Sequence, residues 1–292
     1  MDADQATPQV VRVVAVIGAG TMGSGIAQVF AQAGVAVDLV DASAGALPRA
    51  RDTIARSLSR LVDKNVLAPE ARERVSSLLN FTTDPDVIAR ADLVVEAISE
   101  DADAKRRLFA EIDGLAPART CLASNTSSIS IASLAAATRR PDRVVGLHFM
   151  NPVPLMALVE VVRGRQTSDA TMAMAHAIVA SLGKTAVESA DTPGFIANRV
   201  LMPMINEAVF ALMEGVGTAE AIDAVMRLGM HHPMGPLALA DLIGLDVCVA
   251  ILDVMRDGLN NEKYAPCPLL RELVASGRLG RKTRRGFYEY PG

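Results

Sequence analysis

One histidine and one glutamate stand where they could share a proton. His148 lies near the end of the apolar run 144–149, and Glu160 is the only charge in the apolar run 158–162. If both runs are strands that fold back on each other around Pro154, His148 lies opposite Glu160. A buried carboxylate needs a partner. The pair would fix the histidine tautomer and suit a general base near neutral pH; the alternative is a purely structural hydrogen bond.

A glycine-rich turn follows the first apolar run. Residues 13–17 lead into Gly18-x-Gly20-x-x-Gly23, and a helix of small residues is expected next. In dinucleotide-binding folds the first glycine makes the tight turn, the second admits the pyrophosphate and the third lets helix and strand pack closely. The helix N-terminus then attracts the phosphates. The pattern predicts a dinucleotide site, and the alternative is a glycine-rich turn without a ligand. The predicted cofactor residues here are Gly18, Ala19, Gly20, Thr21, Met22 and Gly23.

The second predicted strand is followed directly by a carboxylate, Asp41. Its position is close to the spacing of about 20 residues at which such sites place a ribose-binding acid. A carboxylate there bonds the ribose hydroxyls and repels a 2′-phosphate. The sequence therefore favours NAD over NADP.

A basic stripe is predicted on the next helix. Four cations there are spaced so that, at about 100° per residue, all of them lie on one helix face. Its members are Arg49, Arg56, Arg60 and Lys64. Such a stripe could attract an anionic substrate. The alternative is a solvated face with Asp52 and Asp63 as partners.

Strands and helices alternate through the first two-thirds of the chain, and only helical periodicity follows Thr192-Pro193-Gly194. This organisation predicts an α/β fold, with a Rossmann-type, doubly wound, mostly parallel sheet followed by an all-α C-terminal domain. The predicted domains are 1–190 and 191–292. Strands are expected over 11–17, 35–40, 92–98, 120–123, 144–149 and 158–162, and helices over 22–33, 45–63, 69–79, 102–113, 196–214, 219–228, 236–255 and 269–275. The helix over 236–255 is apolar on most of its circumference, which predicts either a central core helix or one partly covered by a second subunit.

Composition excludes several classes of protein. The net charge is −4 and aromatic residues make up 3% of the chain, which argues against a nucleic-acid partner. Residues Met1–Gln9 lack the basic start of a signal peptide, and no uncharged apolar run reaches the length of about 18 residues that a membrane span needs. The three scattered cysteines, Cys121, Cys248 and Cys267, indicate reduced packing residues in a cytoplasmic protein with no metal site.

These residues carry a recognisable pattern, and the chain resembles the L-3-hydroxyacyl-CoA dehydrogenase family over about Val11–Tyr290. Several matching segments in the same order are far more specific than the glycine motif alone. They are 18–25 (GAGTMGSG), 124–128 (SNTSS), 148–154 (HFMNPVP), 158–160 (LVE), 193–199 (PGFIANR), 232–236 (HPMGP) and 286–288 (GFY).

The resemblance implies NAD-dependent oxidation of a (3S)-3-hydroxyacyl-CoA, of short chain such as 3-hydroxybutyryl-CoA, and the reverse reduction. His148 would be the general base and Glu160 would orient it. Ser127 would bond the substrate 3-oxygen and lie near the nicotinamide, and Asn198 would hold the acyl group. The further cofactor residues implied are Glu100, Lys105, Asn151 and Lys282, and the implied CoA contacts are Ser57 and Lys64.

The resemblance also implies a homodimer formed through the helical domain. It further implies that the basic stripe binds CoA, because CoA carries phosphates. Two other functions remain open at this point. One is a related dehydrogenase of a free 3-hydroxy acid or sugar acid; the other is a non-enzymatic NAD-binding protein.

Overall fold

The computed structural model describes residues 11–291. The expectation about a signal peptide at Met1–Gln9 lies outside these residues. The chain divides into two compact units, the first ending at Asp191 and the second beginning at Thr192.

An eight-stranded sheet forms the first unit, in the order β3-β2-β1-β4-β5-β6-β7-β8. Neighbouring strands are parallel except β6 and β7, which are antiparallel. The chain moves outward from β1 to β3 and then resumes on the other side of β1, which confirms the predicted doubly wound, mostly parallel sheet. The strands are β1 (Val13–Ile17), β2 (Ala36–Val40), β3 (Leu79–Thr82), β4 (Leu93–Glu96), β5 (Cys121–Ser124), β6 (Val144–Phe149), β7 (Leu158–Arg163) and β8 (Thr185–Ala190).

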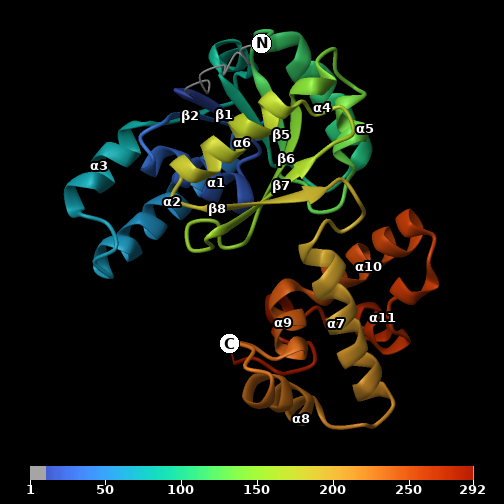
Figure 1. Cartoon of the computed structure of the whole chain (residues 1–292). Coiled ribbons are helices and arrows are strands. Elements are labelled where there is room, and N and C mark those ends of the chain that lie inside the picture. The colour runs from blue at the N-terminus through green and yellow to red at the C-terminus, as the bar shows by residue number, and fades with distance from the viewer. Residues whose placement is uncertain (1–10, 292) are drawn as a thin grey trace, which may run out of the picture. The chain divides into compact units, whose positions relative to one another are not determined.

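Helices flank this sheet (Figure 1). They are α1 (Thr21–Gln32), α2 (Ala46–Asp63), α3 (Pro69–Ser77), α4 (Ala102–Leu115), α5 (Ile131–Ala135) and α6 (Asp169–Ser181), with short 3₁₀ turns η1 (Pro85–Arg90) and η2 (Pro141–Arg143). Val14 and Val16 of β1 join one core cluster with side chains of α1, α2 and α6. Ala15, between them, is also fully buried and faces the opposite side of the sheet, because side chains alternate along a strand. Burial on both faces explains why β1 is a continuous apolar run.

Four helices and strands of this unit lie outside the ranges predicted from the sequence: β3, α5, α6 and β8. Both strands are edge strands in which intermediate or exposed residues predominate, so neither carries the apolar run of a buried strand. The helix expected over 69–79 ends at Ser77, and Leu79 already begins β3.

The second unit is helical, as expected. Its helices are α7 (Ala197–Met213), α8 (Ala219–Ala224), α9 (Pro236–Ile243), α10 (Leu245–Leu259) and α11 (Pro268–Ala275), with the π-helical turn η3 (Val225–Gly229) and the 3₁₀ turns η4 (Glu262–Tyr264) and η5 (Arg281–Thr283). Their apolar core includes Met202, Ile205, Leu237 and Leu252.

The single helix predicted over 236–255 is wrong, because the chain breaks at Gly244 into α9 and α10. Gly244 has φ +108°, a conformation that glycine adopts without the steric penalty of a Cβ atom. The apolar surface is also divided. Leu245 and Leu252 are fully buried, whereas Leu242 and Val247 are 49% and 40% exposed.

Two buried carboxylates hold the C-terminal segment against this unit. Asp241 accepts hydrogen bonds from the backbone N–H groups of Phe287 and Tyr288 and from the Tyr290 hydroxyl. Asp223 accepts one of 2.8 Å from the Tyr288 hydroxyl. These hydrogen bonds therefore hold the aromatic residues near the C-terminus against α8 and α9.

Among residues 11–291, none of the helices is both long enough and apolar enough to cross a lipid bilayer.

Candidate active site

The glycine-rich turn joins β1 to α1 at the point where the strand order reverses. A Cβ atom on Gly18 would lie 2.6 Å from the carbonyl oxygen of Ala97, and one on Gly23 would lie 1.7 Å from that of Gly18. A Cβ atom on Gly20 would meet nothing within 4 Å. The first glycine is thus required by close packing against the loop after β4 and the third by close packing within the turn, whereas the second faces open space where a pyrophosphate could approach.

The first turn of α1 is suited to bind an anion. Its N-cap is Gly20, and no side chain among the described residues caps it, so the amide dipoles of a long helix point at the open space beside Gly20. Asp41, directly after β2, accepts hydrogen bonds of 2.8 Å from the N–H groups of Ala19 and Ser43. The predicted ribose-binding carboxylate is therefore held beside the turn, and these residues fit a dinucleotide.

The neighbouring strand ends supply a second cluster, organised by one carboxylate. Oε1 of Glu100 accepts hydrogen bonds from the hydroxyl of Thr126 at 2.5 Å and from the N–H of Ser127 at 2.9 Å. Burial opposes its ionisation, but the ammonium of Lys105 and these hydrogen bonds hold the pKa of Glu100 below its ordinary value. Glu100 thus reaches from the β4–α4 loop to the loop after β5 that carries Ser127.

The predicted histidine–glutamate pair forms as expected. His148 of β6 is directly opposite Glu160 of β7 in the antiparallel register. Nδ1 of His148 lies 2.7 Å from Oε2 of Glu160, and the two residues are 8% and 1% exposed. The ionised carboxylate accepts the Nδ1–H bond, which selects the tautomer whose basic nitrogen is Nε2.

The strand end beside His148 is held by side chains from other elements. The side-chain oxygen of Asn125 accepts a hydrogen bond of 2.9 Å from the N–H of Phe149. The ammonium of Lys184 donates to the carbonyl oxygens of Val153 and Met156 at 2.7 and 2.6 Å, and its pKa is lowered by burial. These contacts fix both sides of the loop that contains Asn151.

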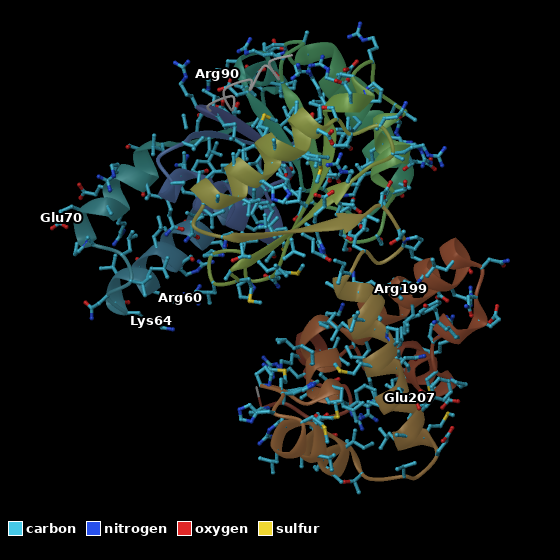
Figure 2. All side chains as sticks on the ribbon, in the orientation of Figure 1. Arg60, Lys64, Glu70, Arg90, Arg199 and Glu207 are labelled. Carbon is cyan, nitrogen blue, oxygen red and sulfur yellow. The ribbon has the colours of Figure 1, made fainter. Side chains whose placement is uncertain are left out.

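The basic stripe lies on the outer face of α2. All four cations are exposed, and Figure 2 shows Arg60 and Lys64 projecting away from the ribbon. The opposite face is buried through Ile54, Leu58 and Leu61. Within residues 11–291 none of the four cations makes an ion pair, so Asp52 and Asp63 are not in contact with the charges of the stripe.

Two predicted site residues belong to the helical unit. Asn198 is a buried residue in the first turn of α7. Lys282 lies in η5, and its Nζ is 2.6 Å from Oδ2 of Asp246. Their roles toward substrate and cofactor stay predictions.

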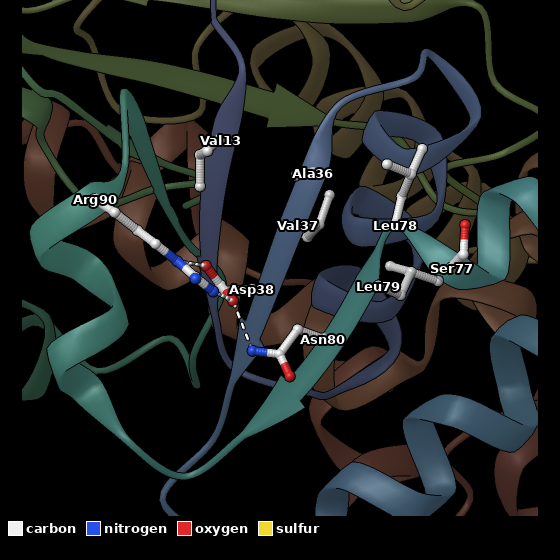
Figure 3. A pocket seen from close by; sticks show the side chains of 9 residues that line it. All are labelled: Val13, Ala36, Val37, Asp38, Ser77, Leu78, Leu79, Asn80 and Arg90. Atoms are coloured by element: carbon white, nitrogen blue, oxygen red, sulfur yellow. Dashed lines mark hydrogen bonds and ion pairs between the residues drawn. The ribbon is translucent and has the colours of Figure 1, made fainter.

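A cavity of about 440 Å³ lies at the opposite, amino-terminal edge of the strands (Figure 3). Asp38 on its wall is bound by the guanidinium of Arg90 and by Asn80 at 2.7 Å. Because Arg90 and Asn80 already bind the Asp38 carboxylate, we interpret these contacts as structural: they connect β2, β3 and η1.

The cysteines are free and buried, as predicted for packing residues. Burial raises the pKa of Cys121 and of Cys248 to about 12, so neither is a thiolate at neutral pH. Among the described residues there is no group of three or more histidine, cysteine, aspartate or glutamate side chains that could hold a metal ion.

The structure therefore places much of the predicted site at one edge of the sheet. The turn at Gly18 and the loop carrying Ser127 follow the carboxyl ends of β1 and β5, and His148 lies at the carboxyl end of β6. Ligands bind at this edge in such sheets. Glu96, Asn125 and Lys184 also bind neighbouring segments at this edge and were not among the predicted site residues. Glu96 carries the same signal that identified Glu160, a single charge in an otherwise apolar strand.

Two family models match the chain. The model described as "3-hydroxyacyl-CoA dehydrogenase, NAD binding domain" matches residues 13–192, and the one described as "3-hydroxyacyl-CoA dehydrogenase, C-terminal domain" matches residues 194–290.

Individual relatives match over almost the whole chain. A 3-hydroxybutyryl-CoA dehydrogenase of Bradyrhizobium diazoefficiens is 53% identical, with 97% of each chain covered. A 3-hydroxyadipyl-CoA dehydrogenase of Escherichia coli is 46% identical over 96% of this chain and 59% of its own length. The crystal structure of an (S)-3-hydroxybutyryl-CoA dehydrogenase from Ralstonia eutropha matches with a TM-score of 0.94 and 47% identity, covering 97% of this chain and all of the other.

Proposed function

The chain belongs to the 3-hydroxyacyl-CoA dehydrogenase family and is an NAD-dependent oxidoreductase, and on that premise we propose that it interconverts (3S)-3-hydroxybutyryl-CoA and acetoacetyl-CoA. The observation that carries the proposal is the buried His148–Glu160 pair, with Nδ1 2.7 Å from Oε2, at the sheet edge that also carries the glycine-rich turn. The S configuration and the C4 acyl chain rest on the names of the similar proteins.

His148 is the base in this proposal. Bound NAD⁺ supplies the hydride acceptor. Oxidation of an alcohol releases a hydride and a proton, and Nε2 of His148 takes the hydroxyl proton. Glu160 accepts the hydrogen bond from Nδ1–H and stabilises the imidazolium that forms. In the reverse direction the same nitrogen returns the proton to the ketone oxygen.

Two polar residues position the substrate. Ser127 donates a hydrogen bond to the 3-oxygen, which favours the partial negative charge that develops there. Asn198 holds the acyl group. Support for Ser127 comes from its loop, which is held by the hydrogen bond from the Ser127 N–H to Glu100. The hydroxyl of Ser127, which lies 3.3 Å from the same carboxylate, turns its single proton to the 3-oxygen when substrate binds.

Cofactor binding is assigned to residues 1–190, together with Lys282 of the helical unit. The turn from Gly18 to Gly23 holds the pyrophosphate, and Asp41 holds the ribose and disfavours the 2′-phosphate of NADP. The proposed set continues with Glu100, Lys105, Asn151 and Lys282, which rest on the family resemblance.

The basic stripe of α2 is the proposed contact for the CoA phosphates, with Ser57 and Lys64 as the named residues. Support comes from the exposure of the stripe on this helix and from the overall charge of −4. Because the protein is acidic as a whole, the stripe is a local attraction for a polyanionic substrate.

We extend the proposal to a homodimer formed through residues 191–292. Of the fifteen exposed large apolar side chains among the described residues, ten lie in the helical unit, although this unit is about a third of the chain. Large exposed apolar surfaces mark interfaces between proteins. The ten are Ile196, Val200, Met213, Val216, Val225, Leu228, Met230, Leu242, Val247 and Val254.

The proposed compartment is the cytoplasm. All three cysteines are free, which suits a reducing environment.

The test of the function is NADH oxidation by the purified protein with acetoacetyl-CoA, free acetoacetate and longer 3-ketoacyl-CoA esters, including the 3-ketoadipyl ester. We expect turnover of the C4 thioester, little turnover of the free acid, and a loss of about 10²–10⁴-fold in His148→Ala. His176→Ala is the matched control, because His176 also faces a glutamate, Glu188, at 3.7 Å but is 41% exposed.

Faster turnover of the free acid would reassign the substrate class. Binding of NADH without turnover of any ester would indicate a non-enzymatic protein. Full activity in a folded His148→Ala variant would remove the base from the proposal.

A further inference from the structure

The loop after β6 is held by a lysine that has no counter-ion in the described part of the chain. Lys184 lies directly before β8, and its ammonium donates hydrogen bonds of 2.7 and 2.6 Å to the carbonyl oxygens of Val153 and Met156. No carboxylate among residues 11–291 forms an ion pair with it. An ammonium removed from water without a counter-ion costs free energy, and burial lowers the pKa of Lys184. What this side chain contributes therefore lies in its two bonds to the loop.

The two bonds lie at the active-site edge of the sheet. β7 is antiparallel to β6, so Leu158 at the start of β7 lies at the edge where β6 ends. Leu158 pairs with Thr185 at the start of β8, which is parallel to β7. Lys184, the residue before Thr185, is therefore at the same edge as His148 and the loop of residues 150–157.

The other side of this loop packs on the helix that follows the glycine-rich turn. Val153 is 2% exposed, and a Cβ atom on Gly25 of α1 would lie only 2.8 Å from the Cβ atom of Val153. Carbon atoms of real side chains do not approach so closely, so this packing requires a glycine within α1. Val153 thus contacts α1 with its side chain and Lys184 with its carbonyl oxygen.

Asn151 lies two residues before Val153 on the loop that is fixed in this way. It is exposed, and within residues 11–291 its side-chain amide forms no hydrogen bond. The amide has two N–H donors and one oxygen acceptor, which are therefore available to a ligand. Because the backbone that follows Asn151 is fixed at Val153 and Met156, the position of this amide depends on Lys184 and on the packing at Gly25.

We propose that Lys184 and Gly25 are positioning residues for Asn151, and that they raise the affinity for NADH through the loop that they hold. The proposal rests on the cofactor role given to Asn151 above. The base is positioned separately, because the sheet register holds His148. A loop that loses its anchor should therefore weaken cofactor binding and leave turnover at saturating cofactor nearly unchanged, as expected when an interaction contributes equally to ground state and transition state.

Fluorescence titration of the purified protein with NADH tests this without any ester. Lys184→Met keeps a side chain of similar length but removes the ammonium, and we expect the NADH Kd to rise about tenfold, which is about 1.4 kcal/mol. Asn151→Ala should raise the Kd by a similar factor. The double variant should bind no more weakly than the weaker single variant, because both changes remove the same contact. In steady-state kinetics with acetoacetyl-CoA, KM for NADH should rise by the same factor and kcat should change by no more than about twofold.

Two matched controls separate the position of the loop from general stability. Arg143 also donates to a backbone carbonyl, that of Arg119, but it lies directly before β6 at the opposite edge of the sheet, so Arg143→Met should leave the NADH Kd unchanged. Gly25→Ala should raise the Kd even though alanine is the better helix former. Gly114→Ala in α4 should not, because a Cβ atom there would meet nothing within 4 Å. Thermal melting of each variant measures its effect on stability by itself.

Three results would overturn the proposal. An unchanged NADH Kd in folded Lys184→Met would mean that the ammonium serves only the stability of the loop. Losses that multiply in the double variant would make Lys184 an independent contact, and an unchanged Kd in Asn151→Ala would remove the residue on which the loop is proposed to act. If Lys184→Met does not fold, Gly25→Ala takes its place in the same cycle. A protein that binds NADH but turns over no ester would instead contradict the proposed function and leave these titrations valid.

Discussion

His148 and Glu160 face each other across β6 and β7, with Nδ1 of the imidazole 2.7 Å from Oε2 of the carboxylate. The hydrogen bond is enclosed, because Glu160 is only 1% exposed. In such surroundings a charge-assisted bond is stronger and more directional than in water. The orientation of the base is therefore built into the sheet register rather than into a flexible loop.

Removing the charge of Glu160 should slow catalysis without unfolding the protein. Glu160→Gln keeps the size of the side chain, but it cannot stabilise the imidazolium that forms on His148. We expect kcat for acetoacetyl-CoA reduction to fall by about 10²–10⁴-fold, the range of general acid–base effects. Steady-state kinetics measure this, and an unchanged circular dichroism spectrum excludes unfolding. Wild-type kcat in this variant would rule out an electrostatic role for Glu160.

The cofactor preference should depend on the charge of Asp41. Asp41→Asn keeps an oxygen that can accept the N–H of Ala19, but it removes the repulsion of a 2′-phosphate. We expect the ratio of kcat/KM for NADPH to that for NADH to rise by about tenfold, which corresponds to about 1.4 kcal/mol. If kcat/KM falls by the same factor for NADH and for NADPH, the Asp41 carboxylate serves only to hold the turn.

The α2 stripe should affect the KM for the CoA ester and not the KM for NADH. Lys64→Glu reverses an exposed charge, and an exposed charge interaction of about 1 kcal/mol corresponds to about a fivefold rise in KM for acetoacetyl-CoA. The effect should fade in high salt because exposed charges are screened, and KM for NADH should not change. Arg165→Glu reverses another exposed cation of the same unit and is the control. Equal effects of the two variants would show only a general charge effect.

The helical unit should lose stability in alkaline solution through Tyr288. Burial, and then the hydrogen bond to Asp223, raise the pKa of the Tyr288 phenol above its ordinary value of 10.0. A raised pKa means that the stability contributed by the phenol is complete below pH 10.0 and is lost as the pH rises above it. Tyr288→Phe should lower the free energy of unfolding by about 1.5 kcal/mol at pH 7, the value of a hydrogen bond to a charged group.

Urea unfolding of both proteins at a series of pH values measures this difference. It should be constant below pH 10.0 and shrink above that value. A difference that does not change with pH would mean that the phenol contributes by packing and not through its proton.

The local patterns of this sequence were sufficient for much of the fold. Val14 and Val16 belong to an unbroken apolar run, because the strand is covered on both faces, and Gly18 to Gly23 follow it with spacing that only one kind of turn requires. The pairing of His148 with Glu160 was also predictable, since the position of the turn sets the register of an antiparallel hairpin. Each of these features depends on neighbours in sequence or on a single strand pairing.

Other features were not readable in this way. β3 and β8 are edge strands without an apolar run, and the helix over 236–255 is broken by the backbone conformation of Gly244, which its apolar neighbours do not reveal. The resemblance implied a cofactor role for Lys105, but its ion pairs with Glu96 and Glu100 could not be read from the sequence, because they are set by the packing of α4 beside β4.

The sequence by itself determined the doubly wound sheet, the glycine-rich turn and the facing of His148 and Glu160, because hydrophobic periodicity and turn chemistry are short-range properties. The tertiary structure alone decided which groups meet around Glu96. Glu96, Ser124 and Lys105 come from two strands and a helix, and they meet because strand pairing and helix packing place β4 beside β5 under α4. In the low polarity of the interior each of these contacts is stronger than it would be in water.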